Sequence, residues 1–96
     1  MRRLAPAVEA TAYFVTAESL TNVAKYAGAT SASVSLTIEQ GRLRLLIRDD
    51  GAGGADLTSG TGLRGLRDRV EALDGRLDVD SPSGLGTTVI AEMPIA

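Results

Sequence analysis

Three polar side chains of different chemistry recur in the N-terminal third of the chain: Glu18, Asn22 and Lys25. They follow the spacing i, i+4 and i+7, so a helix would carry all three on one face. An Asn oxygen can ligate Mg²⁺, a Lys can neutralise a phosphate, and a Glu can orient a water or assist proton transfer. The set therefore suits a metal-bound polyphosphate. Taken alone, a solvated helix face with one Glu–Lys pair is the simpler interpretation.

A second polar cluster, Asp49-Asp50-Gly51-Ala52-Gly53, comes directly after an apolar stretch that predicts a strand. A strand end holds a carboxylate in place, and glycines let a flat ligand approach the backbone closely. An ionised Asp accepts hydrogen bonds, so it can recognise an exocyclic amino group such as that of adenine. An acidic turn at the end of a strand is the alternative interpretation.

Two further glycine motifs follow. Gly60-Thr61-Gly62-Leu63-Arg64-Gly65 opens a predicted helix, where backbone amides can bind phosphate. It matches the GxGxxG of dinucleotide-binding Rossmann domains, but a loop separates it from the preceding strand and the chain is too short for the remaining βαβ units, so we reject that interpretation. Gly84-Leu85-Gly86-Thr87 precedes the last strand and, taken alone, indicates a hairpin turn.

The helix that carries the first cluster is predicted over residues 7–27, which contain neither Gly nor Pro. Pro6 stands at its start and Gly28 just past its end, as is typical of helix termini. Its buried stripe is predicted to be Tyr13, Ala17, Leu20, Ala24 and Ala27. The aromatic residues Tyr13, Phe14 and Tyr26 are expected to line the core or a cleft rather than to stack on nucleic-acid bases.

Strict alternation of apolar and polar residues over 32–38 predicts a half-buried strand with Ala32, Val34, Leu36 and Ile38 on one face. Gln40-Gly41 predicts a turn into a second strand that contains Leu43, Leu45 and Ile47, and the two strands should form an antiparallel hairpin. Leu63, Leu66, Val70 and Leu73 mark a second helix that ends near Asp74-Gly75. Leu77 and Val79 indicate a third strand, and residues 87–93 a fourth. This order predicts a single α+β domain, a two-layer sandwich in which helices cover one face of a mostly antiparallel sheet.

The composition excludes several classes of chemistry. The chain has 96 residues, a net charge of -2, and no His, Cys or Trp. A Ser-His-Asp triad, an ordinary zinc site and a disulfide are therefore impossible within it. The weak net charge predicts no general affinity for nucleic acid or for a membrane surface. No stretch is apolar enough to predict a membrane span or a signal peptide.

In this order, the motifs resemble the ATP-binding (HATPase_c) domain of sensor histidine kinases, in the GHKL ATPase superfamily with its Bergerat-type fold. Residues 18–27 look like the N box, residues 49–53 like the G1 box, and residues 84–87 like the last Gly-Thr element. Residues 60–70 look like the G2 box of the subfamily that signals to NarL/LuxR-type response regulators. The resemblance covers about residues 5–95, and it rests on the presence of all four motifs in the order that the family has.

The resemblance implies ATP and Mg²⁺ as ligands and a role for each matched residue. Catalytic roles fall to Glu18, near the γ-phosphate, and to Asn22, which would also be the metal ligand. Nucleotide contacts are expected from Asn22, Lys25, Tyr26, Asp49, Gly51, Gly53, Gly60, Gly62, Leu63 and Thr87. Of these, Asp49 would bond the adenine amino group. Tyr26 stands where the N box usually has His, and the lid over 54–61 is short, so we expect weak, Mg²⁺-dependent ATP binding.

The resemblance also implies the partners. The γ-phosphate would go to a His on a separate dimerisation domain, absent from residues 1–96, and then indirectly to a response regulator. We expect this domain by itself to be monomeric and cytoplasmic, within a parent kinase that other segments can anchor to a membrane. Two alternatives stay open: a non-catalytic module that binds a nucleotide or a partner protein, and a GHKL serine kinase of the anti-sigma-factor type.

Overall fold

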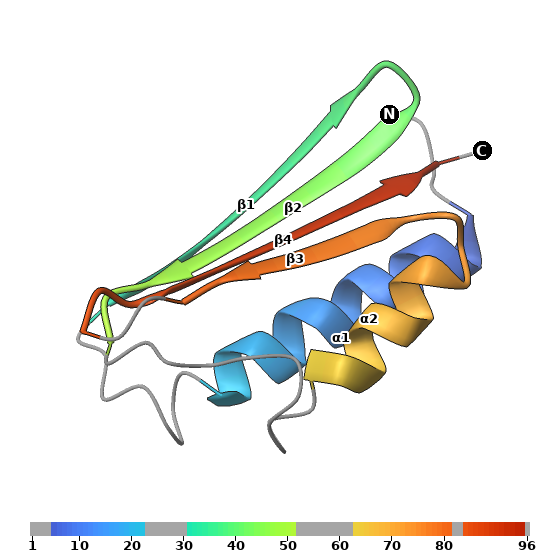
Figure 1. Cartoon of the computed structure of the whole chain (residues 1–96). Coiled ribbons are helices and arrows are strands. Elements are labelled where there is room, and N and C mark those ends of the chain that lie inside the picture. Colours follow the sequence, from blue (N-terminus) through green and yellow to red (C-terminus); the bar gives the residue numbers. More distant parts are fainter. Residues whose placement is uncertain (1–4, 23–30, 52–62, 82–83, 96) are drawn as a thin grey trace.

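The helices and strands occur in the predicted order. A computed structural model describes residues 5–22, 31–51, 63–81 and 84–95. Its elements are α1 (Pro6–Asn22), β1 (Ala32–Glu39), β2 (Arg42–Asp49), α2 (Leu63–Glu71), β3 (Arg76–Asp80) and β4 (Thr87–Pro94). The strands form one antiparallel sheet in the order β1-β2-β4-β3, with both helices on one face (Figure 1). This is the α+β two-layer sandwich that the sequence predicts, and the antiparallel pairing agrees with the rejection of a Rossmann domain.

The first helix turns a different face to the sheet from the one predicted. Its buried residues are Val8, Thr11, Ala12, Val15 and Ser19. Tyr13 is 71% exposed and Leu20 40% exposed, so the predicted stripe through these residues is wrong. Alanines lie all around this helix, and two stripes satisfy the same helical spacing; the β-branched Val8 and Val15 occupy the one that fits against the sheet. Ala24 and Ala27 lie outside the described residues.

The hairpin of β1 and β2 forms as predicted. Glu39 pairs with Arg42 across a two-residue turn, in which Gln40 and Gly41 both have positive φ, 51° and 75°. Such turns match the right-handed twist of the strands that they join. The turn fixes the register that places Leu43, Leu45 and Ile47 of β2 in the core.

The predicted half-burial of β1 is wrong, because every residue of this strand is exposed. Among them are Val34 at 46%, Leu36 at 50% and Ile38 at 48%. The reason is the position of the strand: α1 packs against β2 and β4, and α2 packs against β3 and β4. Neither helix covers β1, which is the end strand of the sheet.

The second half of the chain supplies the remaining side chains of the hydrophobic core. Leu63, Leu66 and Val70 of α2 are buried against the sheet, as are Val89, Ala91 and Met93 of β4. After α2, Asp74 adopts a φ of 60° and the Gly75 N–H donates to the Val70 carbonyl at 3.0 Å, which ends the helix near the predicted Asp74-Gly75. Neither α1 nor α2, the helices that the structure describes, is long and apolar enough to cross a membrane.

Candidate functional site

Four element ends lie toward the same end of the molecule. The described C-terminal end of α1, the C-terminal end of β2, the start of β4 and the first turn of α2 all lie there, whereas the Gln40-Gly41 turn lies at the other end (Figure 1). The sheet register pairs Asp49 at the end of β2 directly with Thr87 at the start of β4. The fold thus brings together predicted site residues that are far apart in the sequence.

Asp49 is the buried carboxylate of this site. Its side chain lies at the end of β2, and the residue is only 8% exposed. Its Oδ1 accepts a hydrogen bond of 2.8 Å from the Gly51 N–H, so the turn that follows the strand holds the carboxylate in one orientation. A carboxylate has about four acceptor positions in its two oxygens, so Asp49 keeps the capacity to accept a bond from a ligand amino group.

Gly86, in the turn just before β4, packs against the backbone of Asp49. Gly86 is buried and has a φ of 81°, and a Cβ added to it would overlap the Asp49 carbonyl oxygen. Only glycine permits so close a backbone approach at that φ. The sequence motif around Gly86 predicts a role for Thr87 and none for Gly86. A glycine directly before the matched Thr was the available signal, whereas the contact with Asp49 is tertiary.

Thr87 is half-buried beside these residues. Its Oγ1 lies 2.6 Å from the Ser81 Oγ, a hydrogen bond that joins the end of β3 to the start of β4. Because Thr87 is also the register partner of Asp49, it lies next to the carboxylate within the sheet. The nucleotide contact expected of Thr87 stays a prediction.

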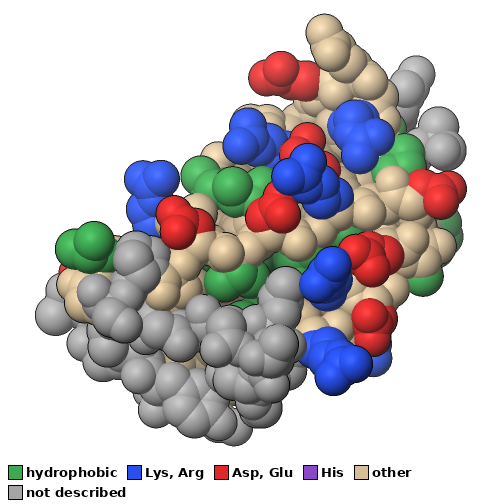
Figure 2. Space-filling view, in the orientation of Figure 1, with side chains coloured by type: hydrophobic (Ala, Val, Ile, Leu, Met, Phe, Trp, Pro, Cys, Tyr) green, Lys and Arg blue, Asp and Glu red, His purple; other side chains and the backbone are tan. Residues whose placement is uncertain are grey.

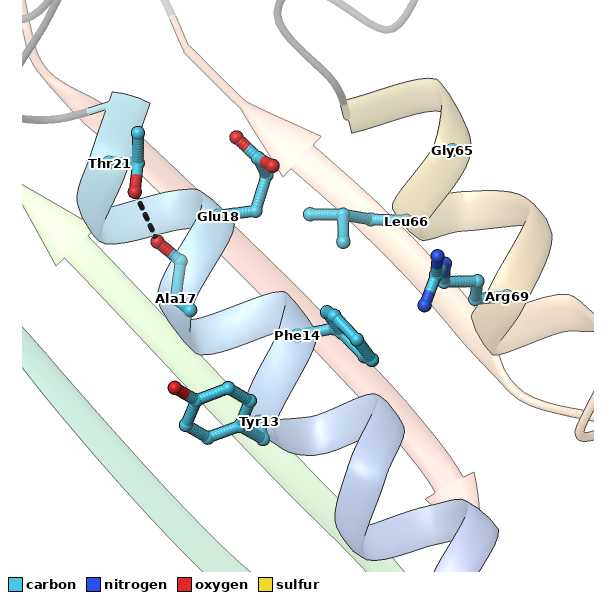
Figure 3. A pocket seen from close by; sticks show the side chains of 8 residues that line it. All are labelled: Tyr13, Phe14, Ala17, Glu18, Thr21, Gly65, Leu66 and Arg69. Atoms are coloured by element: carbon cyan, nitrogen blue, oxygen red, sulfur yellow. Dashed lines mark hydrogen bonds between the residues drawn. The ribbon is translucent and has the colours of Figure 1, made fainter.

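The last turn of α1 contributes two buried polar atoms that have no hydrogen-bond partner within the described ranges. The Asn22 Nδ2 and the Ser19 Oγ are buried and find no hydrogen-bond partner in the part of the chain that the structure describes. An unsatisfied buried polar group costs about 1–3 kcal/mol, so such groups indicate a place for water or a ligand. Glu18, one helical turn before Asn22, is half-buried, and its carboxylate points into the space between α1 and α2 (Figure 3).

A groove of about 410 Å³ runs between the two helices beside this site. The residues that line it are Tyr13, Phe14, Ala17, Glu18, Thr21, Gly65, Leu66 and Arg69 (Figure 3). The Arg69 guanidinium lies 4.3 Å from the centre of the Phe14 ring, a cation–π contact. Tyr13 and Phe14 thus line a cleft, as predicted. Among the predicted site residues with a described position, Glu18 alone lines this groove, which therefore neighbours the site and does not contain it.

The other predicted residues divide into two groups. Leu63 is the first residue of α2 and is only 2% exposed, so its side chain belongs to the core and its backbone opens the helix. The positions of Lys25, Tyr26, Gly53, Gly60 and Gly62 lie outside the described residues.

Charge on the described surface is mixed. Arg67 and Glu71 of α2 form an exposed ion pair at 3.1 Å, so Arg67 belongs to the solvated helix face. Basic and acidic side chains are interspersed over the face shown in Figure 2. Within the described residues, no group of three or more His, Cys, Asp and Glu side chains could hold a metal ion.

Comparison with known proteins gives a consistent result. The family model of the histidine kinase-, DNA gyrase B- and HSP90-like ATPases matches residues 7–96. The chain is 30% identical to the histidine-protein kinase/phosphatase DegS of Bacillus subtilis, over 99% of this chain and 26% of DegS. It is 39% identical to the sensor histidine kinase MctS of Rhizobium johnstonii, over 85% of this chain and 19% of MctS. The chain therefore spans about a quarter or less of the length of these relatives.

Solved structures support the same assignment. The histidine kinase domain of the blue-light activated kinase of Erythrobacter litoralis superposes with a TM-score of 0.72 at 29% identity, covering 88% of this chain and 43% of that one. The ATP-binding domain of PrrB from Mycobacterium tuberculosis shares the fold, with a TM-score of 0.75 at 17% identity over 91% of this chain and 68% of that one. The chain belongs to the histidine kinase-, DNA gyrase B- and HSP90-like ATPase family (HATPase_c), as an ATP-binding catalytic domain of the sensor histidine kinase type.

Proposed function

We propose that this domain binds ATP with Mg²⁺ at the end of the molecule where Asp49, Thr87 and Asn22 gather, and that it donates the γ-phosphate to a His on another domain or chain. The contact of Gly86 with Asp49 is the main support. Gly86 packs against the backbone of a buried Asp in a chain whose relatives include sensor histidine kinases.

Asp49 suits the recognition of adenine. Its carboxylate is buried and held by the Gly51 N–H, so it would meet a ligand without a large loss of side-chain entropy. A carboxylate accepts hydrogen bonds and donates none when ionised, which fits the exocyclic amino group of adenine and not the carbonyl oxygen that guanine has there. Gly51 and Gly53 would leave room for the ring beside the backbone.

Asn22 suits the metal. Mg²⁺ takes oxygen ligands, usually one or two from the protein and the rest from substrate phosphates and water. The Nδ2 of Asn22 is buried and has no partner among the residues that the structure describes, and a turn of the amide exchanges its oxygen and nitrogen. Bound Mg²⁺ would neutralise part of the phosphate charge.

The phosphates would be held by Lys25 and by the backbone amides at Gly60, Gly62 and the start of α2. Tyr26 would line the pocket.

Glu18 is placed to act on the acceptor rather than on the base. It lies one helical turn from Asn22 and its carboxylate faces the space between the helices (Figure 3). There it would orient the incoming imidazole and take its proton as phosphate transfers. The chain contains no His, so the acceptor belongs to a dimerisation domain of the same or a partner kinase in the cytoplasm, and a response regulator follows.

Two measurements test this proposal. Calorimetry should detect Mg²⁺-dependent ATP binding, and labelled ATP should transfer acid-labile phosphate to a supplied His-containing phosphoacceptor domain. Asn22→Ala should weaken Mg²⁺-dependent binding about tenfold or more, the loss of one bond to a charged group. Thr21→Ala, which removes the neighbouring exposed hydroxyl and its 2.8 Å bond to the Ala17 carbonyl, is the matched control and should leave binding unchanged.

The outcomes separate the alternatives. No ATP binding by the folded domain would refute the proposal. Tight binding without transfer to any His-containing acceptor would favour a non-catalytic nucleotide-binding module. Transfer that yields an acid-stable phosphate on serine would favour the anti-sigma-factor type.

A further inference from the structure

The two unpartnered polar atoms of α1 lie one helical turn apart. Ser19 is among the buried residues of the helix, at 4% exposed, and its Oγ has no hydrogen-bond partner within the described ranges. The same holds for the Nδ2 of Asn22, three residues later. Residues at i and i+3 of a helix are neighbours on its surface, with Cβ atoms about 5–6 Å apart. The two atoms therefore belong to one small polar site.

The hydroxyl of Ser19 differs from those of Thr16 and Thr21 on the same helix. Each of these threonines donates to the carbonyl four residues earlier, at 2.9 Å and 2.8 Å. This bond is the usual local choice of a hydroxyl inside a helix. Ser19 has the Val15 carbonyl at the same spacing and leaves it unused, because its Oγ finds no partner in the part of the chain that the structure describes. A buried hydroxyl without a partner destabilises the free domain, so it indicates a partner in another state.

Asn22 is in reach of that hydroxyl. Side chains of a helix lean toward its N-terminus, onto the residues three and four positions earlier, so the Asn22 amide leans over Ser19. A rotation of either side chain can bring Nδ2 within hydrogen-bond distance of Oγ. A serine hydroxyl both accepts and donates, so Ser19 can accept from Nδ2 and donate to the Val15 carbonyl at the same time. That arrangement gives both unpartnered atoms a partner.

We propose that Ser19 is a positioning residue for Asn22: in the nucleotide-bound state its hydroxyl accepts a hydrogen bond from Nδ2 and donates to the Val15 carbonyl. An Asn amide has one donor end and one acceptor end, and only its oxygen can ligate a metal ion. With Nδ2 held on Ser19, Oδ1 is the end left for Mg²⁺. The inference rests on the proposed function, in which Asn22 binds the metal, and it adds a residue to which the sequence motifs give no role.

Calorimetry with and without Mg²⁺ tests this role. Ser19→Ala should weaken the binding of ATP with Mg²⁺ by about three- to tenfold, the loss of one neutral hydrogen bond. Its affinity for ATP in the presence of a chelator should stay unchanged, because the hydroxyl acts through the metal ligand. Thr16→Val is the matched control, since it removes a half-buried hydroxyl of the same helix and keeps the shape of the side chain. It should leave both affinities unchanged.

A double-mutant comparison separates positioning from direct contact with the nucleotide. In the Asn22→Ala background, Ser19→Ala should have no further effect, because no amide remains to be positioned. An equal loss with and without Mg²⁺, or the full loss in the Asn22→Ala background, would overturn the proposal in favour of a direct contact. ATP binding that Ser19→Ala leaves unchanged would overturn this inference alone. No ATP binding by the wild type would overturn the proposed function and this inference with it.

The stability of the free domain distinguishes a positioning role from a purely structural one. Ser19→Ala removes a buried hydroxyl that lacks a partner within the described ranges, so the midpoint of thermal unfolding without ligand should rise. A hydroxyl that served only the fold would give the opposite result. A lower midpoint for Ser19→Ala would therefore overturn the proposal.

Nuclear magnetic resonance of side-chain amides observes the proposed bond directly. The chain contains one Asn and one Gln, Asn22 and Gln40, so its spectrum has two side-chain NH₂ pairs. Saturation with ATP and Mg²⁺ should slow hydrogen exchange of the Asn22 pair in the wild type but not in Ser19→Ala. Gln40, exposed in the turn between β1 and β2, is the internal control and should not change. Equal slowing of the Asn22 pair in both proteins would overturn the proposal.

Discussion

Gly86 and Asp49 are in backbone contact so close that no side chain fits between them. A Cβ at Gly86 would overlap the Asp49 carbonyl oxygen and approach the Asp50 Cα at 3.2 Å. The β3–β4 turn therefore packs against the backbone of the Asp that we assign to adenine. This contact makes the position of Asp49 depend on a glycine in the turn between β3 and β4 as well as on its own loop.

Gly86→Ala should lower both stability and ATP affinity. Its φ of 81° strains any L side chain, and the added methyl must displace the Asp49 backbone. We expect a loss of about 2–3 kcal/mol in the free energy of unfolding, measured by urea denaturation. Gly84→Ala is the control, because Gly84 has a similar φ of 80° but open space around it. Equal losses in the two variants would show that strain, and not the contact, decides the effect.

Asp49→Asn should weaken ATP binding and reduce the preference for ATP over GTP. The amide loses the charge-assisted bond to the adenine amino group and gains a donor that the guanine carbonyl can accept. We expect a loss of ATP affinity of about tenfold or more, from a bond worth about 1.5–3 kcal/mol. Calorimetry with both nucleotides measures the ratio. An unchanged ratio would remove Asp49 from adenine recognition.

The contact of Arg69 with Phe14 should couple the two helices measurably. The guanidinium lies 4.3 Å from the ring centre, and Phe14 is 45% exposed. A double-mutant cycle with Phe14→Leu and Arg69→Met should give a coupling of about 0.5–1 kcal/mol in the free energy of unfolding. Phe14→Leu paired with Arg67→Met serves as the control cycle, because Arg67 bonds Glu71 instead. Coupling of the same size in both cycles would contradict a specific contact.

Gln40→Asn should stabilise the hairpin. Gln40 has a φ of 51° in the two-residue turn, a conformation that Asn adopts more readily than Gln. We expect a gain of about 0.5 kcal/mol, seen as a higher midpoint in thermal unfolding. Gly41→Ala, at a φ of 75° with open space around it, should act in the opposite direction. A lower midpoint for Gln40→Asn would refute this account of the turn.

Local patterns predicted the elements well, because each element follows from neighbours in the sequence. The alternation of β2 and the Gln40-Gly41 turn specify the hairpin and the burial of Leu43 and Leu45. Likewise Leu63, Leu66 and Val70 specify the buried face of α2.

The wrong predictions concern contacts between elements, which decide which face of a helix or strand is buried. Periodicity indicated that Leu36 and its neighbours form an apolar face, but not that both helices would lie over the other strands. Helical spacing allowed two stripes on α1, and shape complementarity with the sheet selected Val15 over Leu20. The role of Gly86 arises from a contact between distant segments, which a single sequence does not reveal.

The pairing of Asp49 with Thr87 has a consequence for the order of folding. Asp49 completes its surroundings only when β4, the last strand of the sheet in the chain, has paired with β2. The hairpin of β1 and β2 is local and can form early. The β2–β4 ladder forms later, because it closes a long loop, and the chain loses the entropy of loop closure before the contacts between the two strands compensate for it. Nucleotide capture would then come late in folding and would be lost in any partly unfolded state that releases β4. ATP affinity is therefore a direct reporter of whether the C-terminal strand is docked.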